Sequence, residues 1–216
     1  MRKIDLKRER KPLYTASAGQ FVLIDVPPLP FLMIDGHGDP NGEGFAEAMQ
    51  ALFSVAYGLK FMSKVECDLD YSVPPMEGLW WADRFERFYD RDKALWSWRI
   101  MVPQPDTITP DMFARAVVGA GRKGKGKGGA ALGRLRLETW AEGLSVQTLH
   151  VGSYDDEGPL IAQLHQWIAD NGLSETGHHH EIYLSDPRRT APEKLKTLLR
   201  QPVQYRSPLA ASPLPS

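Results

Sequence analysis

The stretch GDPNGEGFAEAMQALFSVAYGL, residues 38–59, returns 114 positions later as GSYDDEGPLIAQLHQWIADNGL, residues 152–173. The two copies align without a gap, and their glycines mark the same events: a turn, a helix start and a helix end. This duplication predicts a pseudo-twofold molecule with a cleft where its halves meet. The identical pairs are Gly38/Gly152, Glu43/Glu157, Gly44/Gly158, Ala48/Ala162, Gly58/Gly172 and Leu59/Leu173.

Hydrophobic periodicity places the elements around the first copy. It predicts strands at Phe21–Val26 and Leu32–Ile34, a helix over about residues 44–60 and a strand at Trp96–Val102. A basic arm precedes these elements, and a short helix at Thr109–Val118 follows them.

The second copy shows the same order of elements. It predicts a strand at Arg134–Ala141, a hairpin turn at Glu142-Gly143, a strand at Leu144–Val151, a helix at Pro159–Asn171 and a strand at His180–Leu184. Each repeat is therefore strand, helix, strand, with a further strand expected.

The segments that follow the two helices differ in one respect. With two residues of slack, Tyr71–Pro75 aligns with Tyr183–Pro187, and Leu69 then takes the place of Glu181. The acid belongs to one half only. We therefore expect the function at this asymmetric position.

Composition excludes several classes of function. The chain has 216 residues and a formal net charge of −1, so nothing favours a nucleic-acid partner. Its one cysteine, Cys67, excludes a disulfide framework and a cysteine-built zinc site, and we expect it to be buried. No run approaches the roughly 20 apolar residues of a membrane span, and the charged start does not resemble a secretory signal. We expect a cytoplasmic protein.

Two short motifs suggest ligands that their context does not favour. The tract Gly119–Gly126 nearly matches a phosphate-binding loop, but it ends on glycine instead of Ser/Thr and follows a helix instead of a strand. A basic surface loop is the better interpretation. In the run His178-His179-His180 only alternate side chains share a face of a strand, so we expect no metal site and no cofactor.

Glu181 is the candidate acid. Strand geometry puts it on one face with Tyr183, away from Ile182 and Leu184, which we expect to pack against the helices. A glutamate in mid-strand on an aromatic-rich face is costly unless it is solvent-exposed, paired or functional. The supply of tryptophan and tyrosine favours a pocket for a flat, apolar or cationic ligand.

Several segments in order resemble the GyrI-like small-molecule-binding proteins, in particular their stand-alone branch. The resemblance covers roughly residues 3–203 and rests on the arm at 6–14, on 26–28, and on MIDGHGDP (33–40), AYGLKF (56–61), VPPMEGLWW (73–81), QTLHVGSYDDE (147–157) and HEIYLSDP (180–187).

The resemblance implies an α+β fold in which two β-α-β-β units form one curved antiparallel sheet, with helices on one face and the ligand cleft on the other. We expect a single domain over 1–205, with repeats at about 21–102 and 134–190 and a connector at 103–133 that holds the Lys/Gly loop. Residues 206–216 are expected to be a flexible tail.

The resemblance also implies a chemistry. Some stand-alone members hydrolyse the strained cyclopropane of cyclopropanoid genotoxins, and Glu181 matches their pocket glutamate. It would deprotonate the attacking water, while a tyrosine hydroxyl, from Tyr183 or Tyr71, or a bound water stabilises the developing oxyanion. The residues expected to bind the ligand are Tyr71, Trp80, Trp81, Trp98, Trp140 and His37.

Two other functions stay open from the sequence. One is a non-enzymatic binder or sensor of hydrophobic or cationic compounds, and the other is a protein-binding partner of the gyrase-inhibitor type. The region before the first strand is too short for a helix-turn-helix, which argues against a self-contained regulator. It does not separate enzyme from binder, and the sequence leaves the oligomeric state open.

Overall fold

The structure is a computed structural model that describes residues 1–82, 93–123 and 129–206. The first half contains β1 (Arg2–Ile4), α1 (Leu6–Glu9), β2 (Val22–Val26), β3 (Leu29–His37), α2 (Glu43–Glu66), β4 (Leu69–Tyr71), β5 (Glu77–Trp81) and β6 (Ser97–Pro103). The strands predicted at 21–26 and 96–102 are thus confirmed, and the helix predicted at 44–60 continues to Glu66.

The second half begins after α4 (Pro110–Lys123) and α5 (Gly129–Leu132). It contains β7 (Arg136–Trp140), β8 (Gly143–Val151), α6 (Gly158–Asp170), β9 (Leu173–Glu175), β10 (His179–Tyr183) and β11 (Lys196–Tyr205). The predicted Lys/Gly loop is helical as far as Lys123, and residues 124–128 lie outside the described residues, as do 207–216 of the predicted tail.

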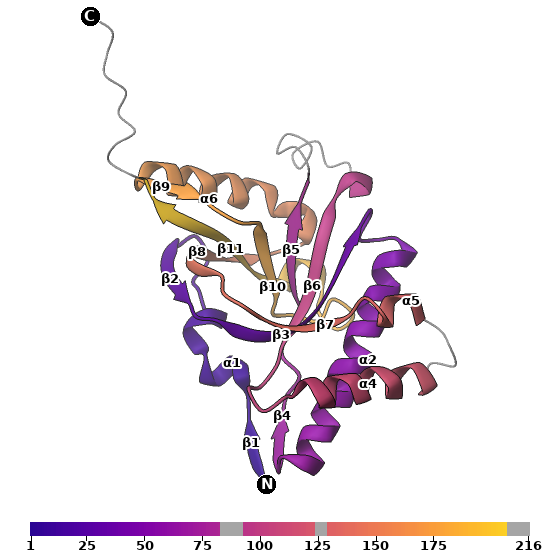
Figure 1. Ribbon diagram of the computed structural model, residues 1–216. Coiled ribbons are helices and arrows are strands. Elements are labelled where there is room, and N and C mark those ends of the chain that lie inside the picture. Colours follow the sequence, from indigo (N-terminus) through magenta and orange to yellow (C-terminus); the bar gives the residue numbers. More distant parts are fainter. Residues whose placement is uncertain (83–92, 124–128, 207–216) are drawn as a thin grey trace, which may run out of the picture.

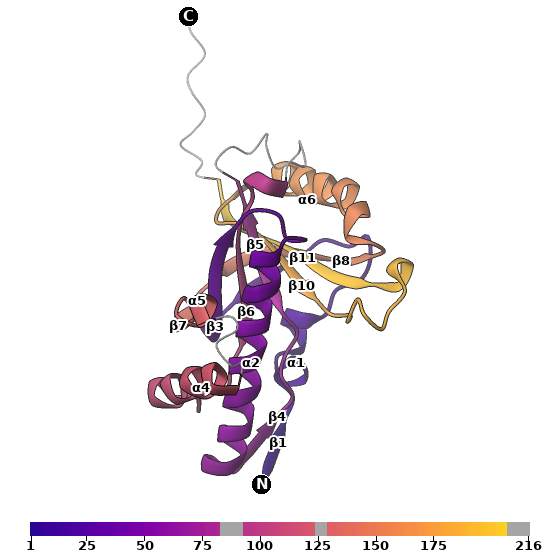
Figure 2. The same ribbon diagram turned by 90° about the vertical axis from the view of Figure 1, so that its right-hand side faces the viewer.

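Within the described residues, nine strands form one curled antiparallel sheet in the order β2-β8-β11-β10-β5-β6-β3-β7, with β9 attached to β11. Helix α6 lies over one end of this sheet, and α2 lies beside the strands of the other half (Figures 1 and 2). The predicted α+β architecture with a curved antiparallel sheet is confirmed.

The two halves exchange their outer strands. β2 pairs with β8 of the second half, and β7 pairs with β3 of the first half. The hairpin predicted at Glu142-Gly143 is therefore wrong, because β7 is the last strand at one end of the sheet and β8 is the second strand from the other end. The turn signal is real, since Gly143 has a positive φ of 76°, but the chain crosses between halves there.

The pseudo-twofold axis passes between the central strands β5 and β10. Phe31 on β3 pairs with Pro103, and its repeat counterpart Ser145 on β8 pairs with Pro202, so the two prolines are equivalent. Three residues before these prolines lie Ile100 on β6 and Leu199 on β11, which are therefore also equivalent. Ile100 pairs with Gly78 and Leu199 pairs with Glu181, so Gly78 is the counterpart of Glu181.

The alignment of Leu69 with Glu181 was therefore wrong. Leu69 lies on β4, which pairs with β1 outside the main sheet. Gly78 and Glu181 face each other directly across the axis. Two acids in these positions would be in contact and would repel, so an acid in one half and glycine in the other is the arrangement that avoids this cost.

The sheet has an apolar core on each face. Helix α2 packs on one face against a cluster that includes Leu52, Ile100 and Trp98, and α6 packs on the same face against Val146 and Leu199. The opposite face is covered by the N-terminal arm, whose 3-10 turn at Lys11–Tyr14 buries Leu13 and Tyr14.

β11 is a central strand that periodicity did not reveal. It pairs with β8, β9 and β10, and it carries the buried polar side chains Thr197, Arg200 and Gln201 beside apolar ones. Its mixed composition hides the strand pattern. The second repeat thus extends beyond the predicted limit near residue 190.

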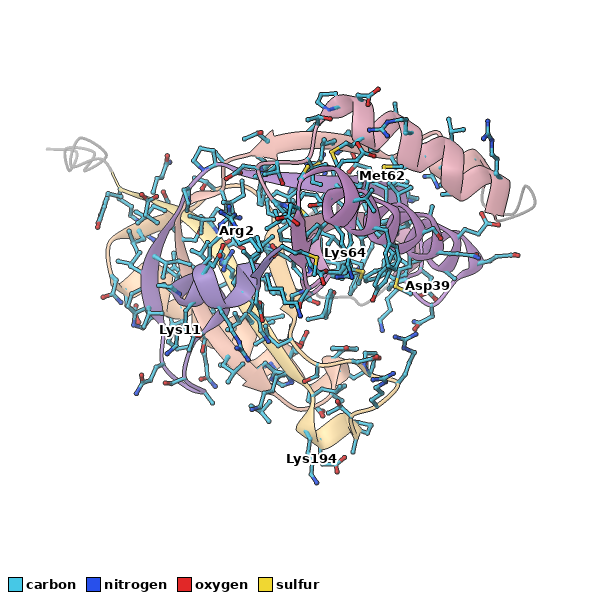
Figure 3. The ribbon with its side chains drawn as sticks, turned by 90° about the horizontal axis from the view of Figure 1, so that it is seen from below. Arg2, Lys11, Asp39, Met62, Lys64 and Lys194 are labelled. Atoms are coloured by element: carbon cyan, nitrogen blue, oxygen red, sulfur yellow. The ribbon has the colours of Figure 1, made fainter. Side chains whose placement is uncertain are left out.

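Two further features concern the surface. Cys67 ends α2 and is exposed, so the prediction that it is buried was wrong. Helix α4 packs across α2 (Figures 1 and 2), and Met62 and Lys64 of α2 are labelled in Figure 3. None of the helices in the described part of the chain is both long and apolar enough to cross a bilayer.

Candidate functional site

Glu181 lies in a fixed hydrogen-bonded chain at the centre of the sheet. The Tyr183 hydroxyl donates to Glu181 Oε2 at 2.6 Å, and the indole Nε1 of Trp80 donates to the same hydroxyl at 3.0 Å. The Glu181 side chain is 13% exposed, so it is largely but not wholly buried. The structure thus brings together Glu181, Tyr183 and Trp80 as the sequence predicted.

The face that carries this chain differs from the expectation. Glu181 and Tyr183 were predicted on the face away from the helices. Tyr183 instead packs against the α2 cluster, while Ile182 belongs to the core under the N-terminal arm. The site therefore lies on the helix-bearing face, between the starts of α2 and α6.

Glu157 is a second buried carboxylate at this site. It precedes α6, is 3% exposed, and has no well-aligned hydrogen-bond partner for Oε1 among the described residues. Burial, and then the negative charge of Glu181, raise the pKa of Glu157 to about 9, against an opposing contribution from Thr197. Glu157 therefore holds a proton at neutral pH.

A tyrosine lies beside both carboxylates. The ring of Tyr154 meets the ring of Tyr183 edge-on, with centroids 5.6 Å apart. Burial, followed by the charges of Glu157 and Glu181, raises the pKa of Tyr154 to about 12. Its hydroxyl is therefore a proton-bearing donor at every physiological pH.

Four aromatic side chains form a wall on the α2 side of the site. Phe45 stacks on Trp80 at 5.9 Å and meets Trp98 edge-on at 4.9 Å, and Trp80 meets Trp96 at 5.8 Å. Trp80 and Trp98 are almost wholly buried, whereas Trp96 is half-buried. The accessible aromatic surface near Glu181 thus comes from Trp96, Tyr154 and Tyr183.

Two glycines provide the space for this wall. A Cβ at Gly36 would lie 2.1 Å from the Trp98 ring, and one at Gly78 would lie 2.9 Å from Trp80 Nε1 and 3.3 Å from the Tyr183 hydroxyl. Both glycines belong to the segments that carry the family resemblance. Their lack of a side chain lets the indoles lie flat on the sheet.

The other residues predicted to bind a ligand do not lie beside Glu181. Trp81 stacks on His178 on the opposite face of the sheet, and Trp140 packs on that face against Phe31 and His180.

Tyr71 and His37 also lie away from Glu181. Tyr71 is 1% exposed in the core, where its hydroxyl donates to Gln104, and burial raises its pKa. His37 is exposed at the end of β3, with Nδ1 3.2 Å from Ser97 Oγ.

The histidine run divides among three environments. His178 stacks on Trp81, His179 Nε2 lies 3.5 Å from Glu181 Oε1, and His180 is fully buried on the opposite face. Among the residues that the structure describes, no group of three His, Cys, Asp or Glu side chains is arranged to hold a metal ion.

His180 is the centre of a buried ionic cluster beneath the site. Its Nδ1 lies 2.8 Å from Glu142 Oε1, and its Nε2 lies 3.1 Å from Glu77 Oε2, off the line of a hydrogen bond. Arg200 donates to Glu142 at 2.9 Å, and Tyr14 donates to Glu77 at 2.9 Å. The cluster ties the N-terminal arm to three strands and the β7–β8 crossing.

A separate groove of about 590 Å³ lies between α2 and α4. Its lining includes the exposed rings of Tyr57 and Phe61 and none of the predicted site residues. It lies on the far side of α2 from Glu181.

Sequence reasoning missed Glu157 and Glu142. The first carried a signal, because Glu43/Glu157 is an identical pair of the repeat, but it appeared to belong to the shared scaffold. In the structure Glu43 is exposed and Glu157 is buried. Glu142 looked like a turn residue, and nothing local shows that its partners are Arg200 and His180.

Known proteins share this fold. A chain from Listeria innocua is 40% identical, with a TM-score of 0.85 over 93% of this chain and 100% of its own length. Another Listeria innocua protein, described as a hydrolase, is 38% identical, with a TM-score of 0.80 over the same shares. The C-terminal domain of EcmrR, 13% identical with a TM-score of 0.55 over 86% of this chain and 98% of its own, shares the fold alone.

No curated protein sequence matches the chain closely enough to count as a relative. The family model of the GyrI-like small molecule binding domain matches residues 20–204, which include both site carboxylates and the main sheet except for the last residue of β11. The chain belongs to the GyrI-like family of small-molecule-binding domains.

Proposed function

We propose that this protein binds a flat, apolar small molecule against Glu181 and hydrolyses the cyclopropane ring of cyclopropanoid genotoxins. The observation that carries the proposal is the Glu181 carboxylate, which accepts a hydrogen bond from Tyr183 at 2.6 Å in a side chain that is still 13% exposed. A carboxylate fixed in this way is preorganised to accept a proton from a water molecule.

The aromatic surroundings support an apolar, ring-shaped substrate. The half-buried rings of Trp96 and Tyr183 and the exposed ring of Tyr154 offer area for stacking close to the carboxylate. A strained cyclopropane conjugated to a carbonyl is already electrophilic, so orientation, a positioned water and charge stabilisation suffice for its hydrolysis.

The comparison proteins support hydrolysis as the reaction class. Two Listeria innocua proteins described as hydrolases are 38% and 37% identical to this chain over most of both lengths. The cyclopropanoid substrate is the finer part of the proposal, and it rests on the match of Glu181 to the pocket glutamate of the stand-alone branch.

In this proposal Tyr183 positions Glu181 and does not serve as the oxyanion donor. Its single O–H proton points to Glu181, and its oxygen accepts from Trp80. Tyr71 is not the donor either, because its hydroxyl is buried against Gln104. The donor must come from another group.

The test is incubation with a cyclopropane-bearing alkylator and detection of the ring-opened product by mass spectrometry. We expect turnover by the wild-type protein and a loss of about 10²–10⁴-fold in Glu181→Gln, the usual contribution of general base catalysis. The exposed Glu193→Gln is the matched control and should keep full turnover. Tight binding without product in the wild type contradicts the hydrolase proposal.

That contradicting result would favour the second candidate, a binder or sensor of cationic compounds. A carboxylate flanked by aromatic rings attracts a cation through both charge and ring quadrupoles. Calorimetry of the binding of a lipophilic cation distinguishes this candidate from the hydrolase. Binding should weaken at least tenfold in Glu181→Gln and be unaffected in Glu193→Gln.

A further inference from the structure

Tyr154 is a tyrosine at the site whose hydroxyl has no role in the hydrolase proposal. It begins the 3-10 turn Tyr154–Asp156 that leads into α6, and the residue is 39% exposed. Its hydroxyl makes no hydrogen bond to any group in the part of the chain that the structure describes, although the charges of Glu157 and Glu181 act on it. The hydroxyl is therefore close to the proposed base and available to a ligand.

Tyr183 connects Tyr154 to the proposed base. The hydroxyl of Tyr183 donates to Glu181 at 2.6 Å, and its ring meets the Tyr154 ring edge-on with centroids 5.6 Å apart. Tyr154 and Glu181 thus contact the same tyrosine, one through its ring and the other through its hydroxyl. A flat ligand that extends across Tyr183 can contact the Tyr154 hydroxyl at one end and the Glu181 carboxylate at the other.

The turn that carries Tyr154 is held from both halves of the molecule. Within the turn, the Ser153 hydroxyl donates to the Asp156 carboxylate at 2.7 Å, and the Asp156 N–H donates to the Ser153 carbonyl at 3.1 Å. From the first half, Lys93 Nζ lies 3.5 Å from Asp155 Oδ1. These contacts restrict the backbone on either side of Tyr154, which limits the reorganisation that a bound ligand would require.

The duplication places this tyrosine in one half only. In the gapless alignment of the repeat, Tyr154 corresponds to Pro40, which has neither a hydroxyl nor an N–H to donate. The counterpart of Glu181 is Gly78, which also lacks a polar side chain. The tyrosine and the acid therefore belong to the same half, as expected for two groups that act on one asymmetric ligand.

The other polar groups near Glu181 are already hydrogen-bonded or buried. Tyr183 donates its proton to Glu181, and the indole N–H of Trp80 donates to Tyr183. His179 is 7% exposed, with Nε2 3.5 Å from Glu181 Oε1. The atoms that are buried are Oε1 of Glu157, Oγ1 of Thr197 and Nε1 of Trp96.

Tyr154 is thus the neutral donor of the described site that is both accessible and without a protein acceptor. Burial, followed by the nearby carboxylates, raises its pKa to about 12, so it keeps its proton at neutral pH. A neutral hydroxyl of this kind donates a hydrogen bond to an oxygen on which negative charge develops, and it does not lose its own proton.

We propose that the Tyr154 hydroxyl binds the carbonyl oxygen of the substrate and stabilises the negative charge that develops there as the cyclopropane opens. This inference rests on the proposed hydrolase function. It narrows the substrate class to flat molecules that carry the conjugated carbonyl far enough from the reacting carbon for Tyr154 and Glu181 to contact one end each.

The step balances in protons and electrons. The oxygen of a water molecule bonds to a cyclopropane carbon, and the proton that it loses goes to Glu181. The ring C–C bond breaks, and its electron pair moves through the conjugated system to the carbonyl oxygen, which accepts the hydrogen bond of Tyr154. That oxygen then takes a proton from solvent, and Glu181 releases one to solvent. The product is an alcohol and an enol or phenol.

The test compares Tyr154→Phe with Tyr57→Phe, a control on α2 that is 49% exposed and lies away from the site. Loss of one oxyanion donor should lower kcat about 10²–10³-fold in Tyr154→Phe and leave kcat unchanged in Tyr57→Phe. KM should change little, because phenylalanine keeps the ring on which the substrate stacks. A kcat within about tenfold of the wild type, whether or not KM rises, overturns the inference.

Failure of the inference is distinguishable from failure of the proposed function. If the wild type makes no ring-opened product, the hydrolase function is wrong. Infrared spectroscopy of a bound flat dienone that lacks the cyclopropane tests Tyr154 separately. The hydrogen bond should lower the carbonyl stretching frequency of this probe in the wild type and in Tyr57→Phe but not in Tyr154→Phe. An equal frequency in the wild type and Tyr154→Phe overturns the inference, whatever the turnover.

Discussion

At the scale of single residues, the Tyr183 hydroxyl decides the geometry of the site. It is the only link in the described residues between the Trp80 indole and the Glu181 carboxylate, at 3.0 and 2.6 Å. Burial, and then Glu181, raise the pKa of Tyr183 well above its ordinary value, so the hydroxyl keeps its proton for this hydrogen bond. The neutral Tyr183 hydroxyl thus orients the Glu181 carboxylate, and it has no second proton to donate to a ligand.

Under the proposed hydrolysis, Tyr183→Phe should therefore reduce turnover without removing Glu181, the proposed base. We expect kcat to fall about ten- to hundredfold, which is the worth of a hydrogen bond to a charged group. Stability should fall by about 1–3 kcal/mol, because the Trp80 N–H loses its buried acceptor. Steady-state kinetics and thermal unfolding measure the two effects.

The exposed Tyr205→Phe serves as the matched control, with 69% of the residue open to solvent. It should change neither quantity. If Tyr183→Phe keeps wild-type kcat, then Tyr183 does not position Glu181 for catalysis.

At the scale of elements, the strands around the site depend on glycines, whose missing side chains leave room for the aromatic rings. On β3 the position of Gly36 is covered by the Trp98 ring, whose indole Nε1 donates to the carbonyl of Gly38 at 3.2 Å. The wall of Phe45, Trp80, Trp96 and Trp98 therefore rests on bare backbone. Any side chain at Gly36 would push Trp98 toward Phe45 and disturb the aromatic contacts of the site.

Gly36→Ala should strongly destabilise the protein, although it adds only one methyl group. The added Cβ would lie 2.1 Å from the Trp98 ring, and relief of such overpacking costs about 1–3 kcal/mol or more. Urea unfolding followed by tryptophan fluorescence measures the loss. Gly44→Ala in α2 is the matched control, because its Cβ would meet nothing within 4 Å.

The control should be neutral or stabilising by about 0.4–1 kcal/mol, since alanine favours the helix and restricts the unfolded chain. Equal stability of the two variants would contradict the account of Gly36.

At the scale of the whole molecule, the ionic cluster joins segments that are remote in sequence. Burial lowers the pKa of His180, but the charges and hydrogen bonds of Glu142 and Glu77 outweigh it and raise the pKa overall. Burial raises the pKa of Glu142, and His180 and Arg200 reverse this and lower it. Glu142 is therefore charged in the folded protein at neutral pH, and its charge together with that of Glu77 favours the charged form of His180.

Glu142→Gln should destabilise the protein by about 3–5 kcal/mol at pH 6, because it leaves the buried charges of His180 and Arg200 without their partner. The folded pKa of Glu142 is lowered, so its contribution is full above its ordinary value of 4.5 and is lost as the pH falls through the folded value. The difference between wild type and variant should accordingly shrink in acid. Urea unfolding at pH 6, 4 and 3 measures it.

Glu138→Gln is the control for a surface ion pair. Glu138 lies 3.1 Å from Arg136 and its side chain is 52% exposed, so its loss should cost about 1 kcal/mol or less. A loss of similar size in both variants would show that the buried cluster does not stabilise the fold.

Part of the fold and of the site was predictable from local pattern. The two helices follow from apolar residues at helical spacing and from the glycines that bound them, and the pairing of Glu181 with Tyr183 follows from strand alternation. The face of that pair was not predictable, because both faces of the sheet carry an apolar core. Alternation identifies two faces and does not say which one the helices cover.

The sequence by itself determined the duplication, the helices and the family, and it singled out Glu181 as the candidate acid. Only the tertiary structure decided that β2 and β7 exchange halves, that Gly78 is the true counterpart of Glu181, and that Glu157 lies close to it. The physical reason is the distance along the chain over which the deciding contacts act. Periodicity records which residues of one element share a face, whereas strand order, register and the burial of Glu142 and Glu157 depend on contacts between segments that only the packed sheet brings together.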